Sequence, residues 1–306
     1  METKHYVDIQ VNGYKGVDFS ADDLTLDGIR SVTKALAERG TVAYCPTVCT
    51  GSMEMYKRNL PMIVESMDDP MIAGIHLEGP FISSAPGAVG AHKVDCVRTP
   101  NVDDFKRMQE YADGKVAILT LAPEEPGADK LIEYAAGQGV AVMFGHHLAD
   151  SASMARGVAA GAKGCTHVGN GLPNQIDRHK NPLWYQLACD ELVGSFITDG
   201  HHLPADFIKV AFRAKGINNF IVTSDAAPLA GMEPGIYGGF GKQVEVSASG
   251  RVSVAGTPYL AGSGATMKEC MAFLGSLGIL SEEELYQVSF VNPLRLLGKT
   301  PESFGK

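Results

Sequence analysis

The chain has 306 residues, of which 45% are hydrophobic and 20% are charged, with a net charge of −9. This is an ordinary globular composition with enough chain for a large core. The negative charge argues against nucleic-acid binding, which selects basic surfaces, but leaves room for a small anion held by a few local cations. The sequence contains neither a signal-like segment nor an apolar window of membrane-spanning length, so we expect a cytoplasmic protein that does not contact membranes.

Strand-like and helix-like segments alternate along the chain from its first residues. Short apolar, β-branched segments predict eight strands, at residues 6–11, 41–48, 71–77, 116–121, 140–144, 164–168, 192–198 and 219–223. Amphipathic segments between them predict helices at residues 26–38, 52–66, 103–111, 129–136, 151–160 and 204–215. This alternation predicts an α/β fold, a (β/α)8 TIM barrel that forms a single catalytic domain over residues 1–306.

The pattern changes after the eighth predicted strand. Residues 228–264 are rich in glycine, and the segments 243–246 and 251–254 flank a Ser-Gly turn, which predicts a small β-hairpin. Helices are predicted to follow at about residues 265–277 and 281–289. The six cysteines include no Cys-x-x-Cys pair, so we expect buried reduced thiols, including Cys45 and Cys49 at one strand end.

Acidic and histidine residues close four of the predicted strands. Glu78 ends the third strand, His146 follows the fifth, His167 lies at the end of the sixth, and Asp225 follows the eighth. In a parallel barrel these ends share one face, the face that carries the active site. A carboxylate and two imidazoles form a typical open zinc site, which has a further position for water. Taken singly, each histidine is more often a structural residue, and each carboxylate a cap or salt-bridge partner.

Motifs at these positions and elsewhere occur in the order of one known family. They are His-Leu-Glu-Gly-Pro-Phe (76–81), Gly-Ala-His (90–92), Leu-Ala-Pro-Glu (121–124), Gly-His (145–146), Thr-His with Asn170 (166–170), Asp-Gly-His-His (199–202), Ser-Asp-Ala (224–226) and Leu-Ala-Gly-Ser (260–263). Through them the chain resembles the N-acetylglucosamine-6-phosphate deacetylases of the amidohydrolase superfamily, over nearly its whole length. The resemblance implies a metal-dependent hydrolase that removes the acetyl group of an N-acetyl amino-sugar phosphate.

The resemblance also implies roles for the strand-end residues. Glu78, His146 and His167 would bind a divalent metal, most naturally zinc, with iron, manganese or cobalt as alternatives. Asp225 would take a proton from water and pass it to the leaving nitrogen. Many barrels of the superfamily carry His-x-His on strand one for a second metal. Here Gln10 and Asn12 stand at those positions, and amides are poor ligands for transition metals, so we expect one metal per subunit.

Substrate contacts follow from the same resemblance. It implies that Asn170, the backbone N–H of Gly171, Arg178 and His202 contact the sugar phosphate, and that His92 helps to polarise the acetyl carbonyl. In the family the phosphate-binding arginine can come from a neighbouring subunit, so a homodimer is implied. A solvated loop charge and an ordinary loop histidine are the structural alternatives for Arg178 and His92.

The sequence departs from the family in three places, one of which is residues 168–169 and 171–172, where the family has bulkier residues beside the sugar. The chain starts at barrel strand one and stops soon after Asn292, so we expect it to lack the small β-sandwich of the family. Residues 179–184 also differ from the usual acidic Pro-Gly pattern beside the substrate. Two alternatives therefore stay open. One is a related hydrolase of N-acetylgalactosamine-6-phosphate or an N-acyl amino acid, and the other is a non-catalytic sugar-phosphate sensor, against which the presence of Asp225 argues.

Overall fold

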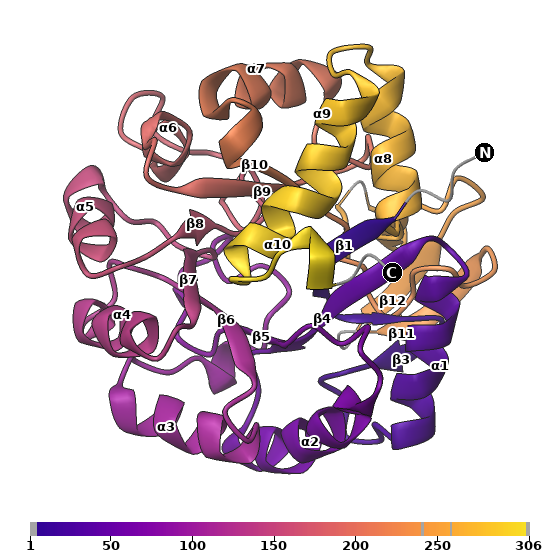
Figure 1. Ribbon diagram of the computed structural model, residues 1–306, viewed down its shortest axis with the longest axis horizontal. Coiled ribbons are helices and arrows are strands. Elements are labelled where there is room, and N and C mark those ends of the chain that lie inside the picture. Colours follow the sequence, from indigo (N-terminus) through magenta and orange to yellow (C-terminus); the bar gives the residue numbers. More distant parts are fainter. Residues whose placement is uncertain (1–4, 240–241, 258, 304–306) are drawn as a thin grey trace.

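A computed structural model describes residues 5–239, 242–257 and 259–303. In this part of the chain, eight parallel strands form the wall of a barrel (Figure 1). In spatial order they are β1 (Tyr6–Val11), β4 (Thr41–Cys49), β5 (Ile75–Glu78), β6 (Val116–Leu121), β7 (Ala141–Phe144), β8 (Gly164–Cys165), β9 (Val193–Ile197) and β10 (Phe220–Thr223). Strand order follows chain order throughout, so the predicted (β/α)8 barrel is confirmed.

Helices surround this wall in Figure 1. They are α1 (Leu26–Ala37), α2 (Met53–Glu65), α3 (Val102–Tyr111), α4 (Ala128–Gly137), α5 (Ser151–Ala159), α6 (Pro182–Ala188) and α7 (Ala205–Lys215), with short 3-10 turns η1 (Ser66–Asp68), η2 (Val94–Cys96), η3 (Ile217–Asn219) and η5 (Pro301–Ser303). Helix α6 was not predicted, because its seven residues are too few for a clear amphipathic period. Its start is nevertheless marked by Asn181, whose side chain accepts from the Trp184 N–H, and by Pro182.

Several strands differ from the predicted ranges by a residue at one or both ends, and two are shorter by more than that. The segment predicted at 71–77 forms a regular strand only from Ile75, and Ile72 makes an isolated bridge to Tyr44. The segment predicted at 164–168 ends at Cys165, because His167 has a φ of +34° that no regular strand accommodates. Both differences lie at strand ends and leave the topology unchanged.

Asp8 closes the barrel between its first and last strands. Its buried carboxylate accepts hydrogen bonds from Thr223 Oγ1 at 2.8 Å, from the Ser224 N–H at 3.1 Å and from the Ser224 hydroxyl. Burial raises the pKa of Asp8, against these hydrogen bonds. One residue beyond β1, the Asn12 N–H donates to Ala226 O at 2.8 Å. These contacts hold the carboxyl ends of β1 and β10 together.

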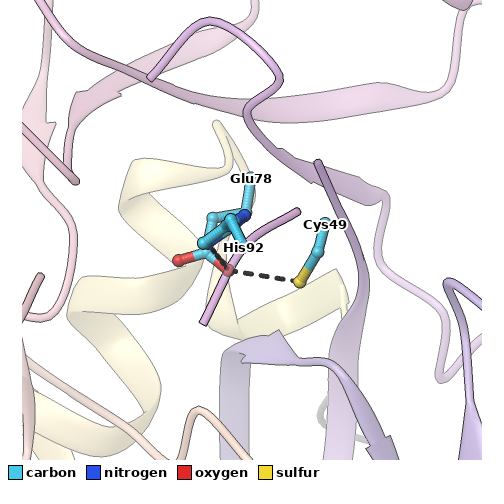
Figure 2. Close-up of side chains that lie close together, drawn as sticks. All are labelled: Cys49, Glu78 and His92. Carbon is cyan, nitrogen blue, oxygen red and sulfur yellow. Dashed lines mark hydrogen bonds and ion pairs between the residues drawn. The ribbon is translucent and has the colours of Figure 1, made fainter. Parts of the chain in front are cut away.

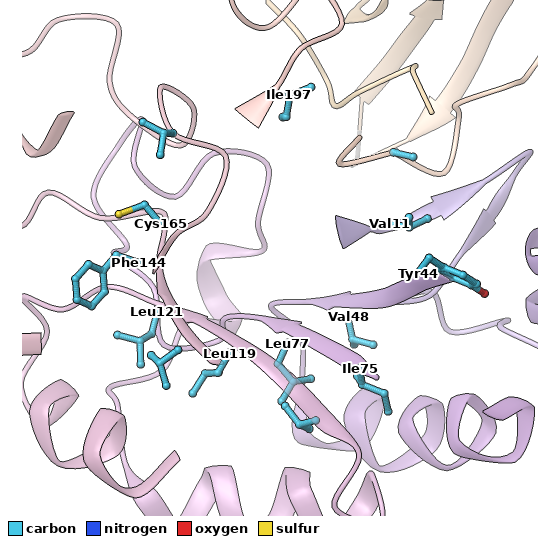
Figure 3. Packing of buried hydrophobic residues seen from close by; sticks show 14 of the residues in the cluster. Val11, Tyr44, Val48, Ile75, Leu77, Leu119, Leu121, Phe144, Cys165 and Ile197 are labelled. Carbon is cyan, nitrogen blue, oxygen red and sulfur yellow. The ribbon is translucent and has the colours of Figure 1, made fainter. Parts of the chain in front are cut away.

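The hydrophobic core lies mainly between the barrel wall and the helices. Figure 3 shows Leu77, Leu119 and Phe144 on this outer side of the strands, where they are completely buried. The inside of the barrel holds a second, smaller apolar cluster together with buried polar residues. There His76 contacts Ile9 O through Nδ1 and Thr120 Oγ1 through Nε2, at 2.9 and 2.8 Å. Burial lowers the pKa of His76 to about 4, so it is a neutral structural residue below the strand ends.

The segment after β10 forms a small antiparallel sheet and then a series of short helical elements. The sheet contains β11 (Gly235–Gly239), β12 (Lys242–Val246) and β13 (Val252–Val254), so the predicted hairpin is present and gains a third strand. After β13 come α8 (Met267–Ser276), α9 (Glu282–Tyr286), the π-helical turn η4 (Gln287–Val291) and α10 (Asn292–Leu296). Near the other end of the chain, a two-stranded ribbon of β2 (Gly13–Tyr14) and β3 (Val17–Asp18) follows β1. Phe290 and Leu294 pack with interior strand residues such as Ile9 and Ile221.

Within the described residues, no helix combines the length and the apolar composition needed to span a membrane.

Candidate metal centre

Three of the predicted site residues meet at the carboxyl end of the barrel. Glu78 is the last residue of β5, His146 lies just beyond β7, and His167 lies just beyond β8. Glu78 Oε1 is 2.8 Å from His167 Nε2 and 3.2 Å from His146 Nε2, and the two imidazole nitrogens are 3.1 Å apart. All three side chains are buried.

The backbone is unusual at the ends of the strands that carry these groups. His146, His167 and Asp225 have φ angles of +52°, +34° and +50°. Residues other than glycine rarely adopt such angles, and each costs about 1–3 kcal/mol. The chain turns sharply there as it leaves each strand. Three strained residues at three strand ends mark this face as the functional one.

Contacts behind the His146 ring fix its orientation. His146 Nδ1 lies 2.8 Å from Ala88 O, which can only accept, so a neutral His146 carries its proton on Nδ1. Its Nε2 lone pair then faces Glu78 and His167, as metal ligation requires. Gly90 and Gly171 leave space around the ring, since a Cβ on either would come within 3.0 Å of it.

The amides of strand one hold the two carboxylates of the site. Gln10 Nε2 donates to Glu78 Oε1 at 2.9 Å, and Asn12 Nδ2 donates to Asp225 Oδ1 at 2.7 Å. Gln10 and Asn12 therefore contact the acids as hydrogen-bond donors.

The two carboxylates have opposite pKa shifts. Burial works against ionisation of Glu78, but its contacts with His146 and His167 outweigh burial and hold its pKa well below the usual range. Burial and the charge of Glu78 raise the pKa of Asp225 to about 7, against the lowering effects of His167, His202 and Asn12. Glu78 is thus a permanent anion, whereas Asp225 can gain and lose a proton near neutral pH.

His92 and Cys49 border the same cluster. His92 Nε2 is 3.2 Å from His146 Nε2, and its Nδ1 is 2.9 Å from Thr50 Oγ1. Burial lowers the pKa of His92 to about 3, so the ring is neutral. Cys49 ends β4, and its Sγ lies 3.6 Å from Glu78 Oε2 (Figure 2). Cys49 was predicted to be a buried thiol, although its strand-end position is the same signal that identified Glu78.

The other residues predicted to contact the substrate do not form one cluster with the three predicted metal ligands. Asn170 and Gly171 lie in the loop that follows His167, and Gly171 lies against the His146 ring. His202 contacts Asp199 Oδ2 through Nδ1 at 2.8 Å, a pair that the sequence analysis did not identify. Arg178 is exposed, and within the described residues no hydrogen bond or ion pair joins its guanidinium to the cluster. His147, the neighbour of His146, faces elsewhere, and its Nε2 lies 2.8 Å from Gln186 Nε2.

The cluster fits a divalent metal ion. With bond lengths near 2.0–2.2 Å, the ligand atoms of a tetrahedral site lie roughly 3.3–3.6 Å apart. The nitrogen and oxygen atoms of Glu78, His146 and His167 are already separated by only 2.8–3.2 Å. One carboxylate and two neutral imidazoles leave a further coordination position for water.

Comparison with known proteins assigns the chain to a family. No protein-family model matches the sequence. The chain is 33% identical to N-acetylglucosamine-6-phosphate deacetylase of Bos taurus, covering 96% of this chain and 73% of that protein. It is 32% identical to the deacetylase of that name from Bacillus subtilis, covering 95% of this chain and 74% of that protein.

Solved structures agree with the sequence comparison. N-acetyl-D-glucosamine-6-phosphate deacetylase from Mycobacterium smegmatis superposes with a TM-score of 0.88 at 27% identity, over 97% of this chain and 78% of that one. A mutant of that enzyme, solved in complex with N-acetyl-D-glucosamine-6-phosphate, superposes with a TM-score of 0.87 at 27% identity, over 96% of this chain and 77% of that one. The extent of these matches, together with the strand-end cluster, shows that the chain belongs to the N-acetylglucosamine-6-phosphate deacetylase family of amidohydrolases.

Proposed function

We propose that this protein hydrolyses the acetamide of N-acetylglucosamine-6-phosphate to give glucosamine-6-phosphate and acetate, with one zinc ion per subunit. The observation that carries the proposal is the convergence of Glu78, His146 and His167 at one barrel face, with Asp225 just beyond β10 at the same face. Family membership supplies the reaction class, the cleavage of an amide bond. The expected cytoplasmic location stays a prediction.

In this proposal Glu78, His146 and His167 hold the metal, which when bound lowers the pKa of a water molecule and polarises a carbonyl. Asp225 acts as the proton carrier. As a carboxylate it takes a proton from the attacking water, and as the acid it gives that proton to the leaving nitrogen. The amide hydrogen bond from Asn12 at 2.7 Å keeps Asp225 oriented during both transfers.

His92 is suited to donate a hydrogen bond to the acetyl oxygen. The Thr50 N–H points at His92 Nδ1 at 3.3 Å, which makes Nδ1 an acceptor. A neutral ring with Nδ1 as acceptor carries its proton on Nε2, the atom that faces the cluster. The His92 Nε2–H can therefore stabilise the negative charge that develops on the acetyl oxygen.

We further propose that the phosphate lies near Asn170, Gly171, Arg178 and His202. Arg178 has the guanidinium that phosphate favours, but its exposure within one chain suits a contact with a second subunit. Trp184, which donates to Arg178 O at 2.9 Å, is 52% exposed. An exposed tryptophan beside an exposed arginine supports a homodimer in which this loop reaches the partner's site.

The experiment that tests the proposal is a substrate panel. Purified protein loaded with one equivalent of zinc is given N-acetylglucosamine-6-phosphate, its galactosamine analogue, unphosphorylated N-acetylglucosamine and N-acetyl amino acids, and acetate release is measured. The proposal expects the highest kcat/KM for N-acetylglucosamine-6-phosphate. A preference for another substrate would restrict the conclusion to amide hydrolysis, and release of acetate from none of them would contradict it.

A further inference from the structure

The second oxygen of Glu78 faces a second set of donor atoms. While Oε1 contacts His146, His167 and Gln10, Oε2 lies 3.6 Å from Cys49 Sγ and 3.7 Å from His92 Nε2. Figure 2 shows the Cys49 thiol pointing toward this carboxylate, with His92 close beside it. Glu78 thus stands between two donor sets that use different oxygen atoms.

The geometry of the second set resembles that of a metal site. A sulfur, a nitrogen and a carboxylate oxygen lie within 4.8 Å of one another. Tetrahedral zinc with a Zn–S bond near 2.3 Å and Zn–N and Zn–O bonds near 2.0–2.2 Å places such atoms roughly 3.3–3.7 Å apart. The side chains of Glu78 and His92 are only 4% and 6% exposed, so few waters compete for the position.

We propose that Cys49, Glu78 Oε2 and His92 Nε2 form a second cation subsite for a thiophilic divalent metal such as Zn²⁺ or Cd²⁺, with Glu78 bridging the two subsites. A thiolate selects such metals over Mg²⁺ and Mn²⁺. Asn12 Oδ1, 3.2 Å from Cys49 Sγ, accepts from the thiol in the metal-free state. The subsite takes one ligand from the end of β4, one from the end of β5 and one from the loop that follows β5.

Metal binding at this subsite changes the protonation of Cys49 and moves the proton of His92 from one ring nitrogen to the other. Cys49 loses its thiol proton to solvent, because the thiolate is the ligand. The His92 ring must present a lone pair at Nε2, so its proton moves to Nδ1. Thr50 Oγ1 can accept from that Nδ1–H at 2.9 Å while donating its own hydrogen to Glu78 O at 3.4 Å. This tautomer keeps a partner for Nδ1 but gives up the hydrogen bond that the Thr50 N–H makes to Nδ1 at 3.3 Å in the metal-free protein.

Occupation of this subsite has a consequence that rests on the proposed function. A metal held by His92 Nε2 removes the hydrogen-bond donor assigned to the acetyl oxygen. The second metal should therefore inhibit turnover, whereas the first supports it. Excess zinc would lower kcat in proportion to occupancy of the Cys49 subsite.

Metal titration of the metal-stripped protein tests the subsite without reference to any substrate. Cd²⁺ is added stepwise while bound metal is counted by elemental analysis and thiolate-to-metal charge transfer is followed by ultraviolet absorption. Wild-type protein should bind two equivalents, and the thiolate band should grow with the second. Cys49→Ser should bind one equivalent without the band. Cys96→Ser is the matched control, since it removes another partly buried thiol that belongs to neither donor cluster, and it should behave as wild type.

Two results would overturn the proposal. The first is saturation of wild-type protein at one equivalent of Cd²⁺ with no thiolate band, which needs no variant and so does not depend on the folding of Cys49→Ser. The second is a full second equivalent retained in Cys49→Ser. Neither result bears on the first metal or on acetate release, so the proposed function would survive both.

Discussion

Gln10 donates its side-chain amide to Glu78 Oε1 across 2.9 Å, inside the barrel and completely buried. This bond directs the carboxylate oxygen toward His146 and His167. We expect Gln10→Met, which keeps the volume but removes the donor, to weaken binding of the first metal by about 10–100-fold, as is typical of partners behind metal ligands. Competition with a chelator measures this affinity, and an unchanged dissociation constant would show that Gln10 does not position Glu78.

Asp225 should be required for turnover but not for metal binding. Asp225→Asn keeps the shape of the side chain but cannot carry a proton, so kcat should fall by roughly 10²–10⁴-fold with metal content unchanged. Elemental analysis of the variant provides the control for metal. Near-native turnover in a variant that retains its metal would exclude the proton-carrier role.

The raised pKa of Asp225 predicts a pH dependence. Burial and the negative charge of Glu78 raise this pKa to about 7 in the metal-free protein. A bound cation favours the ionised form and lowers the pKa from that value. Since the base must be ionised, kcat/KM of the metal-loaded enzyme should fall as pH drops through a pKa below 7. A pH–rate profile that rises toward acid pH would contradict this assignment.

A side chain at position 171 should disturb the His146 ring. An alanine Cβ there would lie 3.0 Å from His146 Nδ1, and the φ of +63° adds about 1 kcal/mol of backbone strain. Gly171→Ala should therefore lower both stability and metal affinity. Gly114→Ala is a matched control, because Gly114 has a φ of +70° but nothing within 4 Å of the new Cβ. Equal metal affinity in the two variants would show that the His146 ring tolerates the extra atom.

Arg178 should affect affinity for phosphate rather than catalysis. Arg178→Ala should raise KM for the phosphorylated sugar far more than for its unphosphorylated analogue, because a charge-assisted contact is lost only with the former. If the arginine comes from a second subunit, mixing Arg178→Ala with Asp225→Asn should restore partial activity through mixed dimers. An equal effect on both substrates would place Arg178 outside the phosphate site.

The barrel could be predicted from the sequence because buried parallel strands and amphipathic helices alternate with clear periods. Glu78, His146 and Asp225 could be located because each follows an apolar run. Helix α6 was missed because seven residues carry too short a pattern. The segment at His167 was predicted too long because a residue other than glycine rarely adopts the φ of +34° found there.

Other features of the site could not be predicted, because they depend on which atoms face each other. A thiol at a strand end has the same sequence pattern whether it packs in a core or, like Cys49, faces a carboxylate. The pairing of His202 with Asp199 and the closure of the barrel by Asp8 join groups whose geometry only the folded chain defines. The position of Arg178 relative to a second subunit is likewise not specified by its spacing from His167.

The central claim is that one metal at Glu78, His146 and His167 makes this protein a deacetylase. The most direct measurement is acetate release from N-acetylglucosamine-6-phosphate by metal-stripped protein as zinc is added in substoichiometric steps. The account predicts negligible release without metal and a linear rise to a maximum at one equivalent, lost in His167→Asn. Full activity after metal removal, or a rise that begins only beyond one equivalent, would contradict it.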